Sequence, residues 1–167
     1  TLELNRHWES LYTGIERANL LLDNLKYADV SLEVLGDVKG QALFLRAYYY
    51  FLLAQEFGDI PLKLTSTKSP DEKPLNRSKV QAVYDQITSD MKMASGLVKP
   101  ISEFDYNTRV TKTAVQAVLA RVYLTMAGYP LRDVARYKDA RIYADSVIQS
   151  GLHDLNPDYQ QIFVNHS

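Results

Sequence analysis

Six prolines divide this chain of 167 residues into segments, because each of them falls between stretches that have helical periodicity. A proline inside a helix removes a backbone hydrogen bond and collides with the preceding turn, so this distribution favours helices that end before each proline. Glycines lie near the same ends, where a left-handed cap is common. Five helical windows remain, at about residues 5–27, 32–57, 79–97, 112–127 and 134–150.

Two of these windows are apolar nearly all round. Residues 42–54 contain one charge, Arg46, and residues 112–127 contain one interior charge, Arg121. A helix with no polar face is typically buried between other elements. The remaining windows have apolar residues three and four apart, which a helix places on one face. Alternation with a period of two never extends beyond a few residues, so the sequence predicts an all-α domain.

Two helix starts carry recognisable signals. Ser78, followed by Gln81 three residues later, predicts a capping box at the start of the third window. Asp133 is a candidate N-cap for the fifth window.

The two apolar windows resemble each other. Residues 41–48 (QALFLRAY) align with residues 116–123 (QAVLARVY), with four of the eight positions identical. An amphipathic window precedes each, which predicts stacked helix pairs of the tetratricopeptide-like type. The connections are long, at residues 58–76 and 98–110, and loops of that length in a compact domain are often functional.

Three polar residues in apolar surroundings are expected to have structural roles. A guanidinium group on an apolar helix must find carboxylates or carbonyls, because burying it unpaired is unfavourable. Arg46 and Arg121 occupy equivalent positions in the two similar segments, which indicates a repeated packing role. Asn19 lies within the apolar stripe of the first window, and its amide is expected to bond backbone groups at a helix end or in a loop.

The residue pattern argues against most catalytic and metal-binding classes. Nineteen basic residues against 20 acidic ones give a formal net charge of −1, which is not the basic character that nucleic-acid binding requires. The sequence has no cysteine, and the three histidines (His7, His153 and His166) share no helical face. Phosphate-binding glycine loops and serine nucleophile elbows are also absent from the sequence. We therefore expect no catalytic residue, metal or cofactor.

Tyrosine is abundant, with twelve Tyr beside five Phe and one Trp. Aromatic rings stack on apolar surfaces, and tyrosine hydroxyls bond to water or ligand. Most of the rings are at positions expected in the core, among them Trp8, Tyr12, Tyr49, Tyr84, Tyr123 and Tyr137. Three aromatic residues instead lie in connections and are candidate ligand contacts, namely Phe104, Tyr106 and Tyr129.

A series of motifs is similar to one known family. Trp-x3-Tyr-x2-Ile-x2-Ala-Asn spans residues 8–19, GQALFLRAYYYF spans 40–51, and FGDIPL spans 57–62. ARVYL at residues 120–124 continues the series. Over most of its length the chain resembles the N-terminal, tetratricopeptide-like part of SusD/RagB nutrient-binding proteins.

This resemblance implies a lipoprotein on the surface of the outer membrane. Such a protein captures glycans or other nutrients and delivers them to a TonB-dependent transporter of the SusC type, without being an enzyme. The family's signal peptide and lipidated cysteine are missing from this sequence, so the membrane anchor is only implied. The family's proteins are also about three times longer, so residues 1–167 are expected to be one helical-repeat domain, the N-terminal fragment of a larger protein.

Two alternatives fit the residues less well. An intracellular tetratricopeptide-like scaffold would bind other proteins through a helical groove. An all-α carbohydrate-active enzyme would turn over a glycan. No apolar run in the sequence approaches the roughly 20 residues that a membrane-crossing helix needs.

Overall fold

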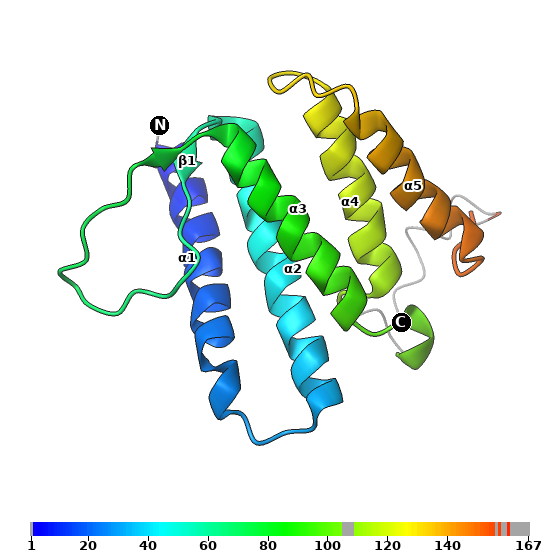
Figure 1. Ribbon diagram of the computed structural model, residues 1–167, viewed down its shortest axis with the longest axis horizontal. Helices are drawn as coiled ribbons and strands as arrows, with labels where there is room; N and C mark the ends of the chain where they lie inside the picture. Colours follow the sequence, from blue (N-terminus) through cyan, green and yellow to red (C-terminus); the bar gives the residue numbers. More distant parts are fainter. Residues whose placement is uncertain (1, 105–108, 156, 158–159, 161–167) are drawn as a thin grey trace.

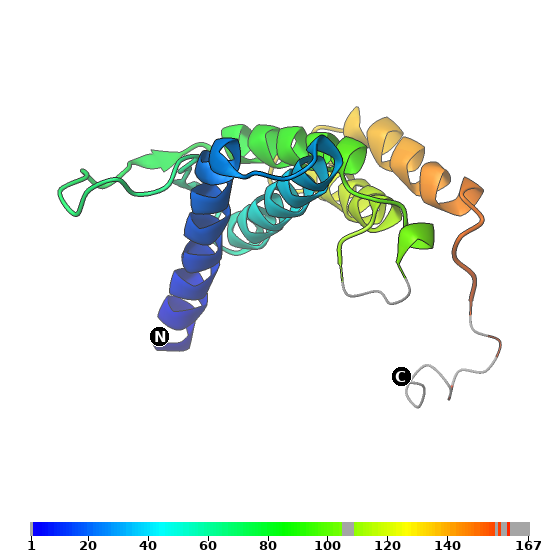
Figure 2. The same ribbon diagram turned by 90° about the horizontal axis from the view of Figure 1, so that it is seen from below.

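The computed structural model describes residues 2–104, 109–155, 157 and 160. Within them, successive α-helices run antiparallel, each packed against the next (Figure 1). Seen from below, α3 and α5 form one layer and α2 and α4 the other (Figure 2). The helices are α1 (Leu2–Asn24), α2 (Leu32–Phe57), α3 (Val80–Leu97), α4 (Lys112–Ala127) and α5 (Arg136–Gln149). The prediction of an all-α fold is confirmed.

Short elements complete the fold. β1 pairs antiparallel with β2, Ile60 opposite Ser78 and Pro61 opposite Arg77, so this ladder closes the base of the connection between α2 and α3. One 3-10 turn extends the end of α1 and another follows α3. These elements are η1 (Leu25–Tyr27), β1 (Ile60–Pro61), β2 (Arg77–Ser78) and η2 (Ile101–Glu103).

The core is centred on α2, which lies between α1 and α3. Its Tyr50, Phe51 and Leu53 are almost completely inaccessible to solvent, as the apolar sequence of this helix predicts. Burial of each such side chain contributes about 1.5–3 kcal/mol to stability. The core extends outward through one face of α3 and of α4, with Val83, Tyr84, Ile87, Met91, Val115, Leu119, Val122 and Tyr123.

Both predicted N-caps are wrong. Ser78 belongs to β2, and α3 begins at Val80, so Lys79 and not Ser78 occupies the N-cap position. Instead, Asp59 Oδ1 accepts a hydrogen bond from the Val80 amide at 2.9 Å, and Asp59 Oδ2 pairs with Lys79 Nζ at 3.0 Å. Similarly, α5 starts at Arg136, and the carboxylate of Asp133 bonds the guanidinium of that residue at 2.9 Å rather than a backbone amide.

No helix in the described part of the chain is long and apolar enough to cross a membrane.

Candidate functional site

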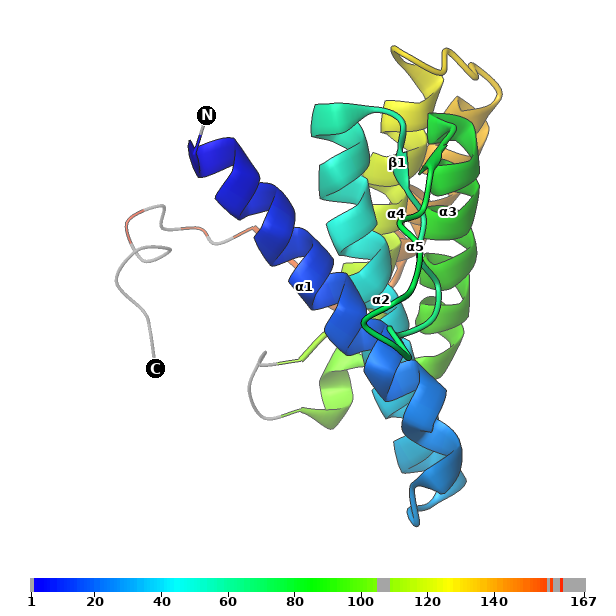
Figure 3. The ribbon, with the colours of Figure 1, turned by 90° about the vertical axis from the view of Figure 1, so that its left-hand side faces the viewer.

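The connection between β1 and β2 turns back along α1 (Figure 3). The connection and the helix enclose a pocket of about 750 Å³. Such a volume is typical of small-molecule sites. α1 supplies one wall through Trp8 and Tyr12. The rest of the lining comes from the connection, namely Pro61, Leu62, Lys63, Leu64, Thr65, Thr67, Ser69, Pro70, Glu72, Lys73, Pro74 and Leu75.

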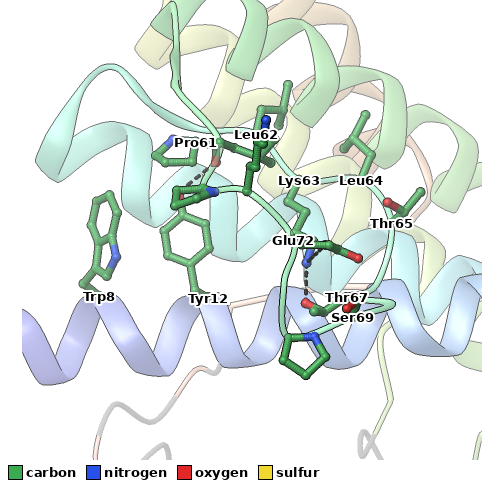
Figure 4. A pocket seen from close by; sticks show the side chains of 14 residues that line it. Trp8, Tyr12, Pro61, Leu62, Lys63, Leu64, Thr65, Thr67, Ser69 and Glu72 are labelled. Atoms are coloured by element: carbon green, nitrogen blue, oxygen red, sulfur yellow. Dashed lines mark hydrogen bonds and ion pairs between the residues drawn. The ribbon is translucent and has the colours of Figure 1, made fainter.

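The α1 wall is aromatic. Trp8 and Tyr12 are four residues apart and therefore lie on the same helix face. Their ring centroids are 4.8 Å apart, and Phe57 meets the Trp8 ring edge-on, also at 4.8 Å. The Tyr12 hydroxyl donates to the carbonyl of Pro61 at 2.7 Å, which ties this wall to the connection. Both rings are half-buried and point from α1 toward Pro61 and Leu62 (Figure 4).

Buried side chains hold the backbone of the opposite wall. The Asn19 amide, which is fully buried, donates to the carbonyls of Lys63 at 3.0 Å and Thr65 at 3.3 Å. The Tyr50 hydroxyl donates to the Lys63 carbonyl at 2.7 Å and accepts from the Lys63 amide at 2.8 Å. Backbone polar groups that lose water need such partners, so these bonds fix where the connection runs.

Arg46 links this wall to the helices behind it. Its Nη1 donates to Asn19 Oδ1 at 2.9 Å and to the Leu64 carbonyl at 3.2 Å. Its Nε and Nη2 donate to the two carboxylate oxygens of Asp90 on α3. Arg46 and Asn19 therefore form one network that joins α1, α2, α3 and the pocket wall.

Arg121 does not repeat this arrangement, so the expectation of matching roles is wrong. Its side chain is exposed, and its guanidinium lies 5.9 Å from the ring centroid of Phe51. Among the described residues, no salt bridge involves Arg121. The physical reason is that Arg46 faces both a carboxylate of the next helix and a connection folded back on the helices. Within the described residues, neither a carboxylate nor a carbonyl bonds the Arg121 guanidinium, which instead contacts the ring of Phe51.

Asp23 fastens the far part of the connection to α1. Its Oδ2 accepts hydrogen bonds from Lys68 Nζ at 2.6 Å, from the Ser66 amide at 3.0 Å and from the Ser66 hydroxyl at 2.8 Å. Lys68, together with these two donors, holds the pKa of the Asp23 carboxyl well below its usual range. The carboxylate is therefore ionised, and the anchor formed, at any physiological pH.

Three charged side chains meet at the polar side of the pocket: Lys63 and Glu72 line it, and Glu16, outside the lining, reaches Lys63 from α1. Lys63 Nζ lies 3.5 Å from Glu16 Oε2 and 3.3 Å from Glu72 Oε2, and it also donates to Thr67 Oγ1. Glu16 Oε1 accepts from the Thr67 amide at 2.6 Å, and Glu72 Oε1 accepts from the Lys68 amide. The Lys68 hydrogen bond lowers the pKa of Glu72. The pocket thus combines an aromatic wall with fixed, ionised hydrogen-bonding groups.

The three aromatic candidates from the sequence lie elsewhere. Phe104 directly follows η2 and is half-buried, whereas Tyr129 follows α4, is 80% exposed and carries the guanidinium of Arg132 at 5.6 Å from its ring. Phe104 and Tyr129 flank opposite ends of α4, which at 16 residues is about 24 Å long. The fold therefore does not bring these two rings together. Tyr106 lies outside the described residues.

The assignment of rings to the core holds for only part of the set. Tyr84 and Tyr123 are buried, but Trp8, Tyr12 and Tyr49 are only partly buried. Tyr137 is 54% exposed, because it lies on the outer face of the last described helix. Trp8 and Tyr12 are thus the functional candidates that sequence reasoning missed. The spacing of Trp8, Tyr12 and Glu16 along one helix face, opposite a long connection, is the signal that could have found them.

Metal ligands do not gather in the described part of the chain, where no group of three His, Asp or Glu side chains could hold an ion. His7 Nε2 lies 3.3 Å from Glu56, and His153 Nε2 lies 2.8 Å from the Thr113 hydroxyl. His166 is outside the described residues.

Comparison with known proteins identifies the family. The model of the SusD-like family, described as starch-binding and associating with the outer membrane, matches residues 2–124. The chain belongs to the SusD-like family. Its resemblance to SusD/RagB proteins in sequence motifs is thereby confirmed.

Individual SusD-like proteins agree with this assignment. A SusD-like protein of Bacteroides ovatus is 28% identical over 96% of this chain and 30% of its own length. A SusD homologue of Bacteroides thetaiotaomicron superposes with a TM-score of 0.89 and 30% identity, over 98% of this chain and 32% of that structure. A structure solved with a xylogluco-oligosaccharide shares the fold, with a TM-score of 0.87 and 24% identity over 98% of this chain and 33% of its own. The chain thus spans 22–30% of the length of the curated relatives that it matches.

Proposed function

We propose that this chain forms the N-terminal helical part of a cell-surface, SusD-like protein that binds glycans. The protein would capture oligosaccharides and deliver them to a TonB-dependent outer-membrane transporter of the SusC type. The observation that carries this proposal is the family match over residues 2–124, whose description names starch binding and association with the outer membrane.

The structure supports a binding role in two ways. The helices form a continuous core, and buried polar bonds fix the one long connection that the structure describes in full, as expected of a rigid scaffold. The pocket beside α1 offers aromatic rings and ionised groups, which suit the binding of a polar ligand that has apolar faces. Family membership favours a nutrient-binding protein over an intracellular scaffold.

Calorimetry with the full-length protein tests the binding function. We expect titration with a panel of neutral and acidic oligosaccharides to give a saturable heat for at least one of them. Prolonged incubation with that glycan should leave it intact, since the protein is proposed not to be an enzyme. Loss of all binding across the panel would contradict the proposal, and released products would favour the enzyme alternative.

The transporter partnership has its own test. A reading frame for a TonB-dependent transporter is expected beside the coding sequence, and the tagged protein is expected to co-purify with that transporter from solubilised outer membranes. Recovery of the protein from the cytoplasm, without a transporter, would instead support the scaffold alternative.

The three aromatic residues in the connections, Phe104, Tyr106 and Tyr129, remain candidate ligand contacts. Tyr129→Ala removes a ring that is 80% exposed, so it should leave the melting temperature unchanged and weaken glycan binding. Phe104→Ala and Tyr106→Ala are the corresponding tests at the other connection. Unchanged affinity in all three variants would exclude these rings from the site.

A further inference from the structure

The pocket between α1 and residues 61–75 has the composition of a sugar-binding site. On one side it presents the rings of Trp8 and Tyr12, both partly exposed (Figure 4). Flat rings of this kind pack against the apolar C–H face of a sugar ring. On the other side it presents the Glu72 carboxylate, hydroxyls and backbone groups, which suit the hydroxyls of a sugar.

The carboxylates retain capacity for a ligand. An ionised carboxylate offers about four lone-pair positions. Glu16 uses its two oxygens for the Thr67 amide and Lys63, and Glu72 uses its two for the Lys68 amide and Lys63. Glu72, which lines the pocket, therefore keeps unused lone pairs that can accept hydrogen bonds from hydroxyl groups.

The charge balance selects against acidic ligands. Lys63 is the cation at the centre of the polar side, and two carboxylates already share it. The other lining cation, Lys73, is exposed at the rim. A uronic acid or sulfated sugar would bring a negative charge beside Glu72, and Lys73, the lining cation without an ion pair among the described residues, is exposed to solvent, where an ion pair contributes little.

The pocket is also held open by the protein itself. Asn19, Arg46, Tyr50 and Asp23 fix the backbone of the connection at Lys63, Leu64, Thr65 and Ser66. A wall that is ordered before binding does not have to be ordered by the ligand, which favours affinity.

We propose that this pocket binds a neutral pyranose ring of the captured glycan, with Trp8 and Tyr12 as its platform and Glu72 as a hydroxyl acceptor. This inference rests on the proposed glycan-binding function and adds to it a location and a class of sugar.

Calorimetry on variants of the full-length protein tests the inference. With the neutral oligosaccharide that the wild type binds, Trp8→Leu is expected to raise the Kd about tenfold, because the platform is lost. Glu72→Gln keeps the side-chain shape but removes the charge, and is expected to raise the Kd about three- to tenfold. The matched controls are Asp71→Asn, a neighbouring carboxylate outside the lining, and Tyr27→Ala, an exposed ring on η1. Both controls should leave the Kd within about twofold.

Each outcome bears on the inference. If Trp8→Leu lowers the melting temperature, its weaker binding could come from unfolding. The Kd of Glu72→Gln then tests the pocket, because Glu72 is exposed and its replacement leaves the core intact. Normal affinity in Glu72→Gln, with the wild type binding the same sugar, would overturn the pocket assignment and leave the proposed function standing. Preference of the wild type for acidic sugars would overturn the neutral class. Loss of transporter co-purification with unchanged glycan affinity would show a protein-docking surface instead. A wild type that binds no glycan would remove the proposed function as well.

Discussion

Arg46 and Asp90 form a buried, bidentate ion pair between α2 and α3. Arg46 Nε lies 2.7 Å from Asp90 Oδ2 and Nη2 lies 2.9 Å from Oδ1, and the side chains are only 8% and 4% exposed. Gln86 adds a third donor to the same carboxylate at 2.8 Å. Because each charge has lost its water, each depends on the other, and the network as a whole positions the pocket wall through Asn19 and Leu64.

Arg46→Met should lower the free energy of unfolding by about 3–5 kcal/mol, because Asp90 would remain buried without its cation. Urea denaturation monitored by circular dichroism measures the change. The matched control is Arg121→Met in the similar segment of α4, where the side chain is exposed and loses only a contact with Phe51, worth about 0.5–1 kcal/mol. Equal losses in the two variants would contradict the difference in role described for the two arginines.

Asn19→Ala should destabilise the protein by about 1–3 kcal/mol and loosen the pocket wall, because the carbonyls of Lys63 and Thr65 and the Arg46 guanidinium each lose a partner. Hydrogen exchange at the Ser66 and Thr67 amides should accelerate more than at amides of α4. Asn24→Ala is the control, since the exposed Asn24 amide bonds only within its own helix, to the Leu20 carbonyl. Unchanged exchange in Asn19→Ala would mean that Asn19 does not hold the connection.

Two glycines of α2 should respond to alanine with opposite signs. At Gly40 a Cβ would lie 2.7 Å from Val98 Cγ1 and 3.0 Å from the Val98 backbone nitrogen, so Gly40→Ala is expected to cost about 1–3 kcal/mol. At Gly36 the nearest atom is Leu97 Cδ2 at 3.7 Å, so Gly36→Ala should stabilise by up to about 1 kcal/mol through helix propensity. Thermal melts of both variants check the pair, and a stabilised Gly40→Ala variant would refute the close approach of α2 to the end of α3.

High pH should destabilise the fold through its buried tyrosines. Burial raises the pKa of Tyr50 and of Tyr84 to about 12, from 10.0 in the unfolded chain. Because the folded pKa is the higher one, this contribution to stability is complete below pH 10 and is lost as the pH rises toward 12. Absorbance titration of tyrosinate should therefore show a late component in the folded protein. Tyr50→Phe should remove the share of Tyr50 from this component and leave that of Tyr84, whereas a curve with a single midpoint near 10 would contradict the burial of both rings.

The helices could be predicted because local sequence patterns largely determine where each helix begins and ends. Proline and glycine positions, apolar periodicity and the nearly all-apolar stretch around Arg46 located α2 and α4 with the bounds that the structure has. The caps were not predictable, since Asp59 reaches Val80 only after β1 and β2 have paired, and that pairing joins residues far apart in the sequence.

The site was less accessible to sequence reasoning than the fold. The length of the 58–76 connection indicated function, but nothing local showed that it folds back on α1, because the bonds from Asn19, Tyr50 and Asp23 that hold it span long stretches of chain. Helical spacing alone also could not distinguish Trp8, which lines a pocket, from Tyr84, which is enclosed. Similarly, matching motifs suggested matching roles for Arg46 and Arg121, although the partners of a side chain come from its neighbours in space.

The decisive measurement is a crystal structure of the full-length protein with a bound neutral oligosaccharide. We expect a pyranose ring against Trp8 and Tyr12, with a hydroxyl within hydrogen-bonding distance of Glu72. A sugar bound elsewhere, with other parts of the protein filling the space between α1 and residues 61–75, would contradict this expectation.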